Sequence, residues 1–181
     1  FSQMAREERP IPDWVVCGAG TGGTSATIGR FIRYQRHDTR LLVADPVNSV
    51  FHRHYADHAV EELPEGCGSC IEGIGRPRVE PSFVPGVIDR MIAVDDAESI
   101  GAMRALSARL GRRVGGSTGT NLWACAKLVE EMATAGERGS IVTLLCDGGE
   151  RYGCTYYDDA WLAERGIDWH RAAERVASLW R

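Results

Sequence analysis

The feature that most constrains the fold is an apolar segment that runs directly into a glycine-rich turn. Residues 14–17 read Trp-Val-Val-Cys, and residues 18–24 read Gly-Ala-Gly-Thr-Gly-Gly-Thr. A strand, a turn and a following helix bring free backbone N–H groups to one point, where the helix dipole adds positive potential. Glycines also allow an anion to approach the backbone closely. The sequence therefore predicts a site for a phosphorylated ligand at this turn.

The rest of the chain alternates short apolar runs with helical patterns. We predict strands at 14–17, 41–44, 91–94 and 141–146, the last with the continuous apolar composition of a strand buried on both faces. We predict helices at 25–35, from Asp95 to a stop at Gly111, and from a second glycine-rich turn at 115–121 to Gly136, with two short helices in the tail. This order predicts an α/β fold: an open, mainly parallel sheet with helices on both faces.

Three sequence details define the predicted helices. Asp95 and Glu98 have the spacing of a capping box, and Asp168 is expected to cap the last helix. Apolar spacing predicts which side chains face the core. In the first long helix these are Ile100, Met103, Leu106 and Leu110, and in the second they are Leu122, Cys125 or Ala126, Val129 and Met132.

Composition limits the class of protein. With 181 residues and 44% hydrophobic content, we expect residues 1–181 to form a single globular domain or most of a larger one. Its irregular part is the long segment 46–89, rich in glycine and proline, and a loop of this length is more often functional than idle. A net charge of -4 and a pI near 5.8 argue against a nucleic-acid partner. The chain has no apolar run of about 18 residues and no basic leader, so we expect no membrane segment and a cytoplasmic location.

The cysteines and histidines do not predict a metal site. Cys17 and Cys146 lie in apolar, strand-like runs, where a free thiol usually serves as a small buried hydrophobe. Cys67 and Cys70 have C-x-x-C spacing, but no second pair stands at zinc-ribbon distance. The histidines at 52, 54 and 58 alternate with charged and polar residues, which favours an exposed surface. We therefore predict no metal.

A dinucleotide site is an alternative interpretation of the first glycine turn. Gly18, Gly20 and Gly23 satisfy G-x-G-x-x-G, and Asp45 follows 22 residues after Gly23, about where an acid that binds ribose belongs. This pattern alone is a weak signal, and Pro46 directly follows the acid. The sequence therefore leaves a second interpretation open, in which the chain is a non-catalytic module that binds NAD or phosphate.

Six short motifs together resemble one enzyme family. In chain order they are Gly20-Thr21-Gly22-Gly23-Thr24, Asp45-Pro46-x-x-Ser49, Gly73-Ile74-Gly75, Phe83-Val84-Pro85, Gly116-Ser117-Thr118-Gly119 and Asp147-x-Gly149-Glu150-Arg151-Tyr152. The chain resembles the cysteine synthase and cystathionine β-synthase family of pyridoxal-phosphate enzymes. The sequences of the last two motifs are similar to those of bacterial L-cysteine desulfhydrases.

The resemblance implies a cofactor and a set of site residues. The cofactor would be pyridoxal 5'-phosphate, with its phosphate bound by Gly20, Thr21, Gly22, Gly23 and Thr24. Ser117 would form a hydrogen bond with the pyridine nitrogen, although it could instead only cap its helix. A mobile loop beside the substrate would contain Gly73, Ile74 and Gly75, although a plain turn is the alternative. Asp147, Glu150, Arg151 and Tyr152 would support the ring end of the site or form an internal ion pair.

The implied reaction is α,β-elimination. A neutral hydroxyl at the pyridine nitrogen does not hold that nitrogen protonated, which favours expulsion of a β-substituent. L-cysteine would give sulfide, pyruvate and ammonia; β-replacement, which makes cysteine from O-acetylserine and sulfide, is the close alternative. The link between Gly75 and Phe83 is longer than in most relatives and contains Arg76 and Arg78, which either attract a carboxylate substrate or are solvated.

The family's chemistry also needs a lysine that forms a Schiff base with the cofactor. The chain has one lysine, Lys127, which matches no family motif and is expected on a solvated helix face. The resemblance therefore implies the C-terminal portion of the enzyme, without its N-terminal lobe, and a chain that is inactive alone. A complete enzyme would be a homodimer. A companion chain with the missing lobe, or a catalytically dead partner subunit, are further possibilities.

Overall fold

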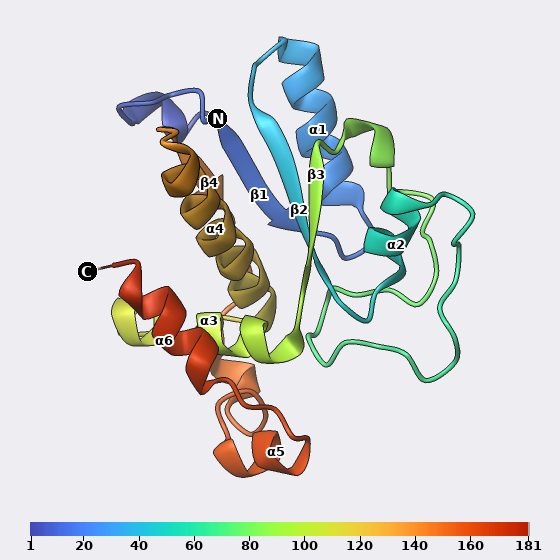
Figure 1. Ribbon diagram of the computed structural model, residues 1–181, viewed down its shortest axis with the longest axis vertical. Helices are drawn as coiled ribbons and strands as arrows, with labels where there is room; N and C mark the ends of the chain where they lie inside the picture. The colour runs from blue at the N-terminus through green and yellow to red at the C-terminus, as the bar shows by residue number, and fades with distance from the viewer. Residues whose placement is uncertain (181) are drawn as a thin grey trace.

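A four-stranded sheet forms the centre of the molecule in the computed structural model, which describes residues 1–180 (Figure 1). Each strand runs parallel to its neighbours, in the order β3-β2-β1-β4. The strands are β1 (Trp14–Gly18), β2 (Arg40–Pro46), β3 (Arg90–Val94) and β4 (Ile141–Thr143). The predicted α/β class with an open parallel sheet is confirmed.

Helices connect the strands, because parallel neighbours need a crossover. The two sides of the sheet carry different helices: α1 and α2 lie on one side, and α3, α4 and α6 on the other (Figure 1). The α-helices are α1 (Gly23–Gln35), α2 (Val50–Ala56), α3 (Asp96–Leu110), α4 (Gly116–Ala135), α5 (Asp159–Glu164) and α6 (His170–Ser178). Short 3-10 helices span Met4–Arg6, Pro85–Val87 and Glu150–Tyr152. The segment 46–89, predicted as irregular, thus contains α2 and one 3-10 helix.

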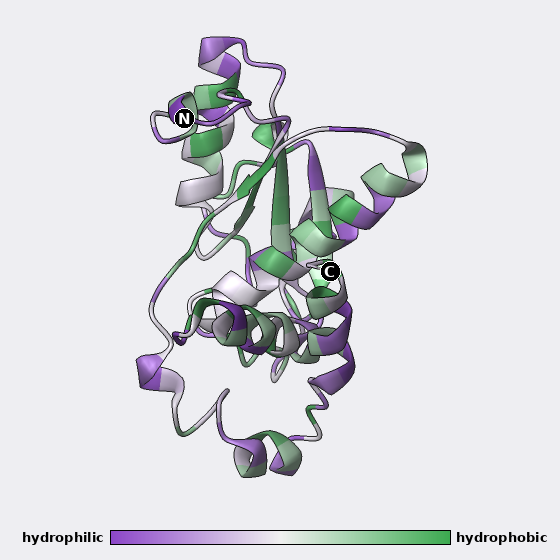
Figure 2. Cartoon of the chain, turned by 90° about the vertical axis from the view of Figure 1, so that its left-hand side faces the viewer, coloured by the Kyte–Doolittle hydropathy of each residue, from purple (hydrophilic) through white to green (hydrophobic). Residues whose placement is uncertain are grey.

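Strand β1 shows why the sheet is covered on both faces. Its side chains alternate between faces, so Trp14 and Val16 pack with α4, whereas Val15 and Cys17 pack with α1 and α2. All four are buried, and the strands are drawn mainly in the colours of hydrophobic residues (Figure 2). A continuous apolar run is the composition that two buried faces require. The predicted burial of Cys17 is confirmed.

A third apolar cluster joins the long segment to the tail of the chain. Ile71 and Ile74 pack with Tyr152, Tyr156 and residues of α3 and α5. The Tyr156 hydroxyl donates to the carbonyl of Cys70 at 2.5 Å and accepts from the N–H of Glu72 at 2.8 Å. These contacts fix residues 70–74, which lie beside the glycine turn described below.

The predicted helix ends are largely confirmed. Asp95 and Glu98 form the capping box of α3, and Gly111 follows the helix with φ +66°. Asp168 accepts a hydrogen bond from the N–H of His170 at 3.1 Å, but the N-cap residue of α6 is Trp169, so the predicted cap is wrong by one residue. These signals are local, so the surrounding fold does not alter them.

The predicted strand 141–146 is wrong beyond residue 143. Leu144 and Leu145 are 40% and 52% exposed, and Cys146 is exposed instead of buried. The reason is the position of β4, which lies at the edge of the sheet and pairs only with β1. The chain then turns toward α4, where the N–H of Cys146 donates to the Thr118 hydroxyl at 2.9 Å.

The predicted inward faces of the long helices are partly wrong. Leu110 and Val129 are 43% and 42% exposed. Small residues form much of the α3–α4 contact instead: a Cβ at Gly119 would lie 2.0 Å from the carbonyl oxygen of Ser99. The helices therefore approach closely along small side chains, which a pattern of large apolar residues does not reveal.

None of the helices within residues 1–180 combines the length and the apolar composition that crossing a membrane requires.

Candidate cofactor site

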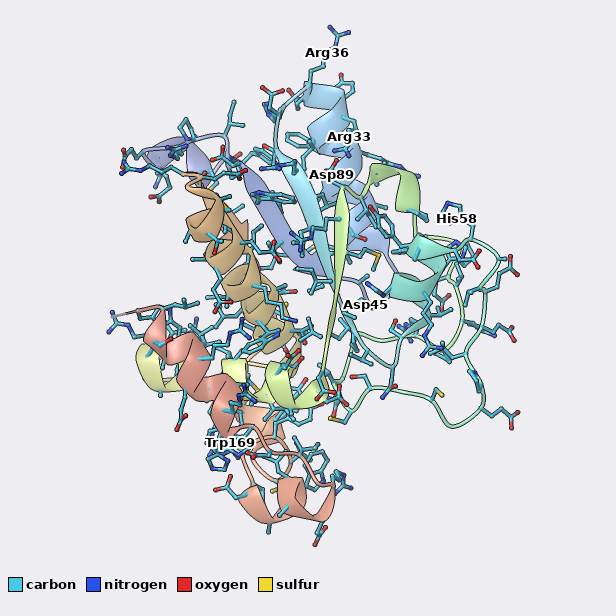
Figure 3. The ribbon with its side chains drawn as sticks, viewed as in Figure 1. Arg33, Arg36, Asp45, His58, Asp89 and Trp169 are labelled. Carbon is cyan, nitrogen blue, oxygen red and sulfur yellow. The ribbon has the colours of Figure 1, made fainter. Side chains whose placement is uncertain are left out.

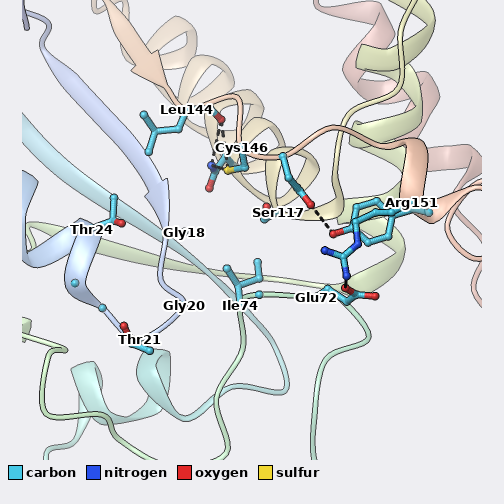
Figure 4. A pocket seen from close by; sticks show the side chains of 16 residues that line it. Gly18, Gly20, Thr21, Thr24, Glu72, Ile74, Ser117, Leu144, Cys146 and Arg151 are labelled. Carbon is cyan, nitrogen blue, oxygen red and sulfur yellow. Dashed lines mark hydrogen bonds and ion pairs between the residues drawn. The ribbon is translucent and has the colours of Figure 1, made fainter.

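A cavity of about 440 Å³ opens at the carboxyl ends of β1 and β4, where ligands commonly bind in parallel sheets. In Figure 4, Thr21 and Thr24 lie on one side of it, Ser117, Cys146 and Arg151 lie on the other, and Ile74 lies between them. The lining residues are Gly18, Gly20, Thr21, Gly22, Gly23, Thr24, Glu72, Gly73, Ile74, Ser117, Asn121, Leu144, Cys146, Asp147, Arg151 and Tyr152. The cavity thus brings together every predicted site residue except Gly75 and Glu150.

The glycine turn presents unpaired donors to this cavity. Gly22 is the N-cap of α1, with φ +91° and no side-chain cap. Within residues 1–180, no backbone carbonyl accepts a hydrogen bond from the N–H groups of residues 20–24. Free N–H groups at a helix N-terminus bind anions, and phosphate accepts several hydrogen bonds at once. The turn therefore fits the phosphate group that the sequence predicts.

Close packing behind the turn also requires its glycines. A Cβ at Gly20 would lie 2.6 Å from the carbonyl oxygen of Gly73, and one at Gly22 would lie 2.5 Å from Cα of Phe83. Real Cβ atoms do not approach backbone atoms so closely. The sequence explained these glycines only by the close approach of an anion. The structure adds a second reason, which is their close contact with the segment 73–83.

Ser117 lies in the first turn of α4 and lines the cavity. The N-cap of α4 is Gly115, and no side chain caps the helix, so the interpretation of Ser117 as a helix cap is wrong. No hydrogen bond within the described residues involves its hydroxyl, which leaves that hydroxyl available to a ligand.

Asn121 is a lining residue that the sequence analysis missed. It lies one helical turn after Ser117 and is 1% exposed. Its Nδ2 contacts the Leu144 carbonyl oxygen at 3.5 Å, and Oδ1 has no partner within residues 1–180. A buried acceptor without a donor is rare, so this atom fits a group supplied by a ligand. The signal in the sequence was its spacing of four residues from Ser117, which places both on one helix face.

Polar pairs line the other side of the cavity. The Tyr152 hydroxyl donates to Asp147 at 2.6 Å, and burial together with this carboxylate raises the pKa of Tyr152. Arg151 donates to Glu72 at 2.7 Å. This ion pair joins the segment 70–74 to the segment after β4. It is exposed and its acid is Glu72, so the predicted alternative of an internal pair among residues 147–152 is wrong for Arg151.

Three residues considered in the sequence analysis, Gly75, Lys127 and Glu150, do not line the cavity. Gly75, with φ +78°, packs against Pro46. Lys127 lies on α4, with Nζ 3.9 Å from the Glu98 carboxylate, and does not line the cavity. The predicted solvated helix face is confirmed in part, because the Lys127 side chain is 31% exposed.

Asp45 cannot serve a dinucleotide as predicted for the alternative interpretation. Its side chain is fully buried beside α2 (Figure 3), where one oxygen accepts from the N–H of His52 at 2.9 Å. Burial raises its pKa to about 7. A ribose hydroxyl would need an accessible carboxylate. The acid that made the dinucleotide interpretation attractive is therefore an internal residue.

Among residues 1–180, the side chains considered for metal binding come together at most in pairs, such as His54 and His58, whose ring centroids lie 5.1 Å apart. The described residues contain no group of three His, Cys, Asp or Glu side chains placed to hold a metal ion. Cys67 and Cys70 are free thiols. His58 lies on an outer loop beyond α2, and its Nδ1 contacts the carbonyl oxygen of His54 at 2.8 Å (Figure 3).

Comparisons with known proteins agree with this geometry. Residues 2–147 match the model of a family described as pyridoxal-phosphate dependent enzyme. The chain is 58% identical over 93% of its length to an L-cysteine desulfhydrase of Mycobacterium tuberculosis, of which it covers 45%. It is 31% identical over 86% of its length to a cystathionine beta-synthase of Apis mellifera, covering 29% of it. It is 32% identical over 76% of its length to a cysteine synthase of Aquifex aeolicus, covering 37% of it. The chain thus spans less than half the length of each of these relatives.

Proposed function

The chain belongs to the family of pyridoxal-phosphate dependent enzymes, and we propose that the protein that contains it releases sulfide from L-cysteine by α,β-elimination. One observation carries the proposal: a single cavity joins the free N–H groups of the 20–24 turn to the free hydroxyl of Ser117. The family's cofactor is the predicted pyridoxal phosphate. The similarity to an L-cysteine desulfhydrase supports the choice of reaction.

The residues of the chain would bind the two ends of the cofactor. The N–H groups and hydroxyls of Thr21 and Thr24 would hold the phosphate, and the Ser117 hydroxyl would donate to the pyridine nitrogen. Bound pyridoxal phosphate supplies a ring that withdraws electrons from Cα of an attached amino acid. Because Ser117 is neutral, it does not hold the pyridine nitrogen protonated, and this favours loss of a β-substituent over transamination.

The substrate end of the cavity would lie beside Gly73 and Ile74. There the Glu72–Arg151 pair joins the segment 70–74 to the segment after β4. In the proposed reaction the Cα–H and Cβ–S bonds of L-cysteine break, and water completes the conversion to hydrogen sulfide, pyruvate and ammonia. The cavity residues are assigned binding and orientation, and Lys127 is assigned none of these steps.

The test compares three proteins: the purified full-length wild type, Ser117→Ala and the control Lys127→Ala. Equal amounts of sulfide and pyruvate from L-cysteine are expected. Formation of cysteine from O-acetylserine and sulfide, with no sulfide released from L-cysteine, would instead establish β-replacement. Absence of both reactions would refute an enzyme of this kind.

Cofactor binding provides a readout independent of turnover. Ser117→Ala removes one hydrogen bond and is expected to weaken pyridoxal-phosphate binding by about threefold to tenfold. Lys127→Ala should bind the cofactor as the wild type does, because Lys127 does not line the cavity and its ammonium lies near Glu98 and the ring of Trp123. Equal effects of the two substitutions would contradict the assigned site. We also propose that the complete protein is a homodimer and that its substrate is L-cysteine or O-acetylserine. Light scattering on the same protein would measure the oligomeric state.

A further inference from the structure

We propose that Arg76 and Ser82 are positioning residues that hold the glycine turn in its phosphate-binding conformation. Together with Phe83 they form an outer clamp, whose residues contact the turn but do not line the cavity. The inference rests on the proposed cofactor and deepens it, because it assigns a role to the long link between Gly75 and Phe83.

The outer clamp holds two consecutive carbonyl groups of the turn. Arg76 Nε donates to the carbonyl oxygen of Gly20 at 2.9 Å. The Ser82 hydroxyl donates to the carbonyl oxygen of Thr21 at 2.7 Å. Behind the next residue, Phe83 lies so close that a Cβ at Gly22 would overlap its backbone. Three successive residues of the turn are therefore in contact with one short segment.

These two hydrogen bonds determine where the N–H groups point. No cis peptide bond occurs in the described residues, and in a planar trans peptide the C=O and N–H bonds point in opposite directions. With its carbonyl held by Arg76, the Gly20–Thr21 peptide directs the N–H of Thr21 away from the clamp. Ser82 does the same for the N–H of Gly22. Both residues line the cavity, and no backbone carbonyl of the described chain accepts from either group.

Arg76 also contributes charge. Its side chain is half-buried, and within residues 1–180 no carboxylate lies within 4.0 Å of its guanidinium. Arg151, the arginine that lines the cavity, is by contrast paired with Glu72. A guanidinium bound to the turn's carbonyl adds positive potential beside a site for a dianion, in surroundings that screen charge less than water does.

The clamp is itself held in place by α2. The N–H of Arg76 donates to the Ser49 hydroxyl at 3.1 Å, and its carbonyl accepts from the N–H of Val50 at 2.7 Å. The ring of Phe83 stacks on Phe51 with centroids 4.2 Å apart. The start of α2 thus fixes the clamp, which fixes the turn.

Arg78 provides a matched control. It is an arginine two residues along the same segment, it is exposed, and it forms a backbone bridge with Glu62 instead of contacting the turn. If any positive charge on this segment supported cofactor binding, Arg76→Ala and Arg78→Ala would weaken pyridoxal-phosphate binding equally. A clamp on the turn predicts that only Arg76→Ala weakens it.

The test measures dissociation constants of pyridoxal phosphate and of pyridoxal, which lacks the phosphate, on the purified full-length protein. For Arg76→Ala we expect about tenfold weaker binding of pyridoxal phosphate and less than a twofold change for pyridoxal. Ser82→Ala should show the same selectivity with a loss of about threefold, and Arg76→Lys should recover part of the affinity. Arg78→Ala should match the wild type. Equal loss for both ligands, or no loss for pyridoxal phosphate, would overturn the proposal.

Two measurements separate this proposal from its alternatives. If Arg76→Ala does not fold, as judged by thermal unfolding, the selectivity of Arg76→Lys and Ser82→Ala decides the question. If the wild type binds no pyridoxal phosphate, the proposed function fails. Titration of the same variants with inorganic phosphate then tests the clamp independently, and equal phosphate affinity of the wild type and Arg76→Ala refutes it.

Discussion

Replacing Gly22 by alanine tests the packing behind the phosphate turn. Gly22 has φ +91°, a conformation that costs a residue with a side chain about 1–2 kcal/mol. The new Cβ would also lie 2.5 Å from Cα and 2.8 Å from N of Phe83, well inside ordinary contact distance. Forcing a methyl group into a well-packed site costs about 1–3 kcal/mol. The two effects predict a total destabilisation of about 2–5 kcal/mol.

Thermal unfolding followed by circular dichroism measures this loss. At about 2–4 °C per kcal/mol for a domain of this size, Gly22→Ala should lower the midpoint by about 4–20 °C. Gly66→Ala isolates the backbone cost, because Gly66 has φ +82° and a Cβ there would have no neighbour within 4 Å. Gly23→Ala is the control for adding a methyl group to the turn without a clash, because its Cβ would meet only the Thr21 hydroxyl at 3.9 Å.

The comparison of the three variants decides the argument. We expect Gly23→Ala to unfold close to the wild type and Gly66→Ala to lose only the backbone cost. Gly22→Ala should lose clearly more than Gly66→Ala. If Gly22→Ala and Gly66→Ala were equally stable relative to the wild type, the backbone of Phe83 would be free to move away, and the rigid contact inferred here would be refuted.

Two further substitutions test buried polar groups. Asp45 has a folded pKa of about 7, raised by burial from about 4 in an unfolded chain, so its contribution to stability is present below about pH 4 and is lost as the pH rises toward 7. Asp45→Asn keeps an oxygen for the N–H of His52. Between pH 5 and pH 8 the midpoint of thermal unfolding should fall less for this variant than for the wild type. An equal fall in both proteins would mean that Asp45 does not titrate in this range. Tyr156→Phe leaves the Cys70 carbonyl and the Glu72 N–H without their partner. It should therefore lower the free energy of unfolding, measured by urea titration, by about 1–3 kcal/mol. An unchanged midpoint of the urea titration would show that water replaces the hydroxyl.

Much of the fold was predictable because its signals are local. The capping box of Asp95 and Glu98 and the glycine after α3 depend only on residues within one or two turns of the chain. The apolar run of β1 reports burial on both faces directly. The candidate site was predictable to the same extent: the 20–24 turn and Ser117 each open a helix, and such a start exposes N–H groups wherever it occurs.

Other properties depend on neighbours that the sequence does not name. The end of β4 at Thr143 follows from its place at the edge of the sheet, and the exposure of Leu110 and Val129 follows from close α3–α4 packing along small residues. The unpaired oxygen of Asn121 became visible only when α4 was placed against the end of β1. Linear spacing carries no information about such distances.

The sequence by itself determined the alternation of strands and helices, the two glycine-rich helix starts and, through six motifs in order, the family. Only the tertiary structure decided that these starts face one cavity, that Asp45 is internal and that Arg76 reaches the carbonyl of Gly20. The physical reason is the range of the interactions involved. Helix caps and strand periodicity act over a few residues, whereas a cavity and a clamp require residues more than fifty positions apart to meet, which only the packed sheet and its helices bring about.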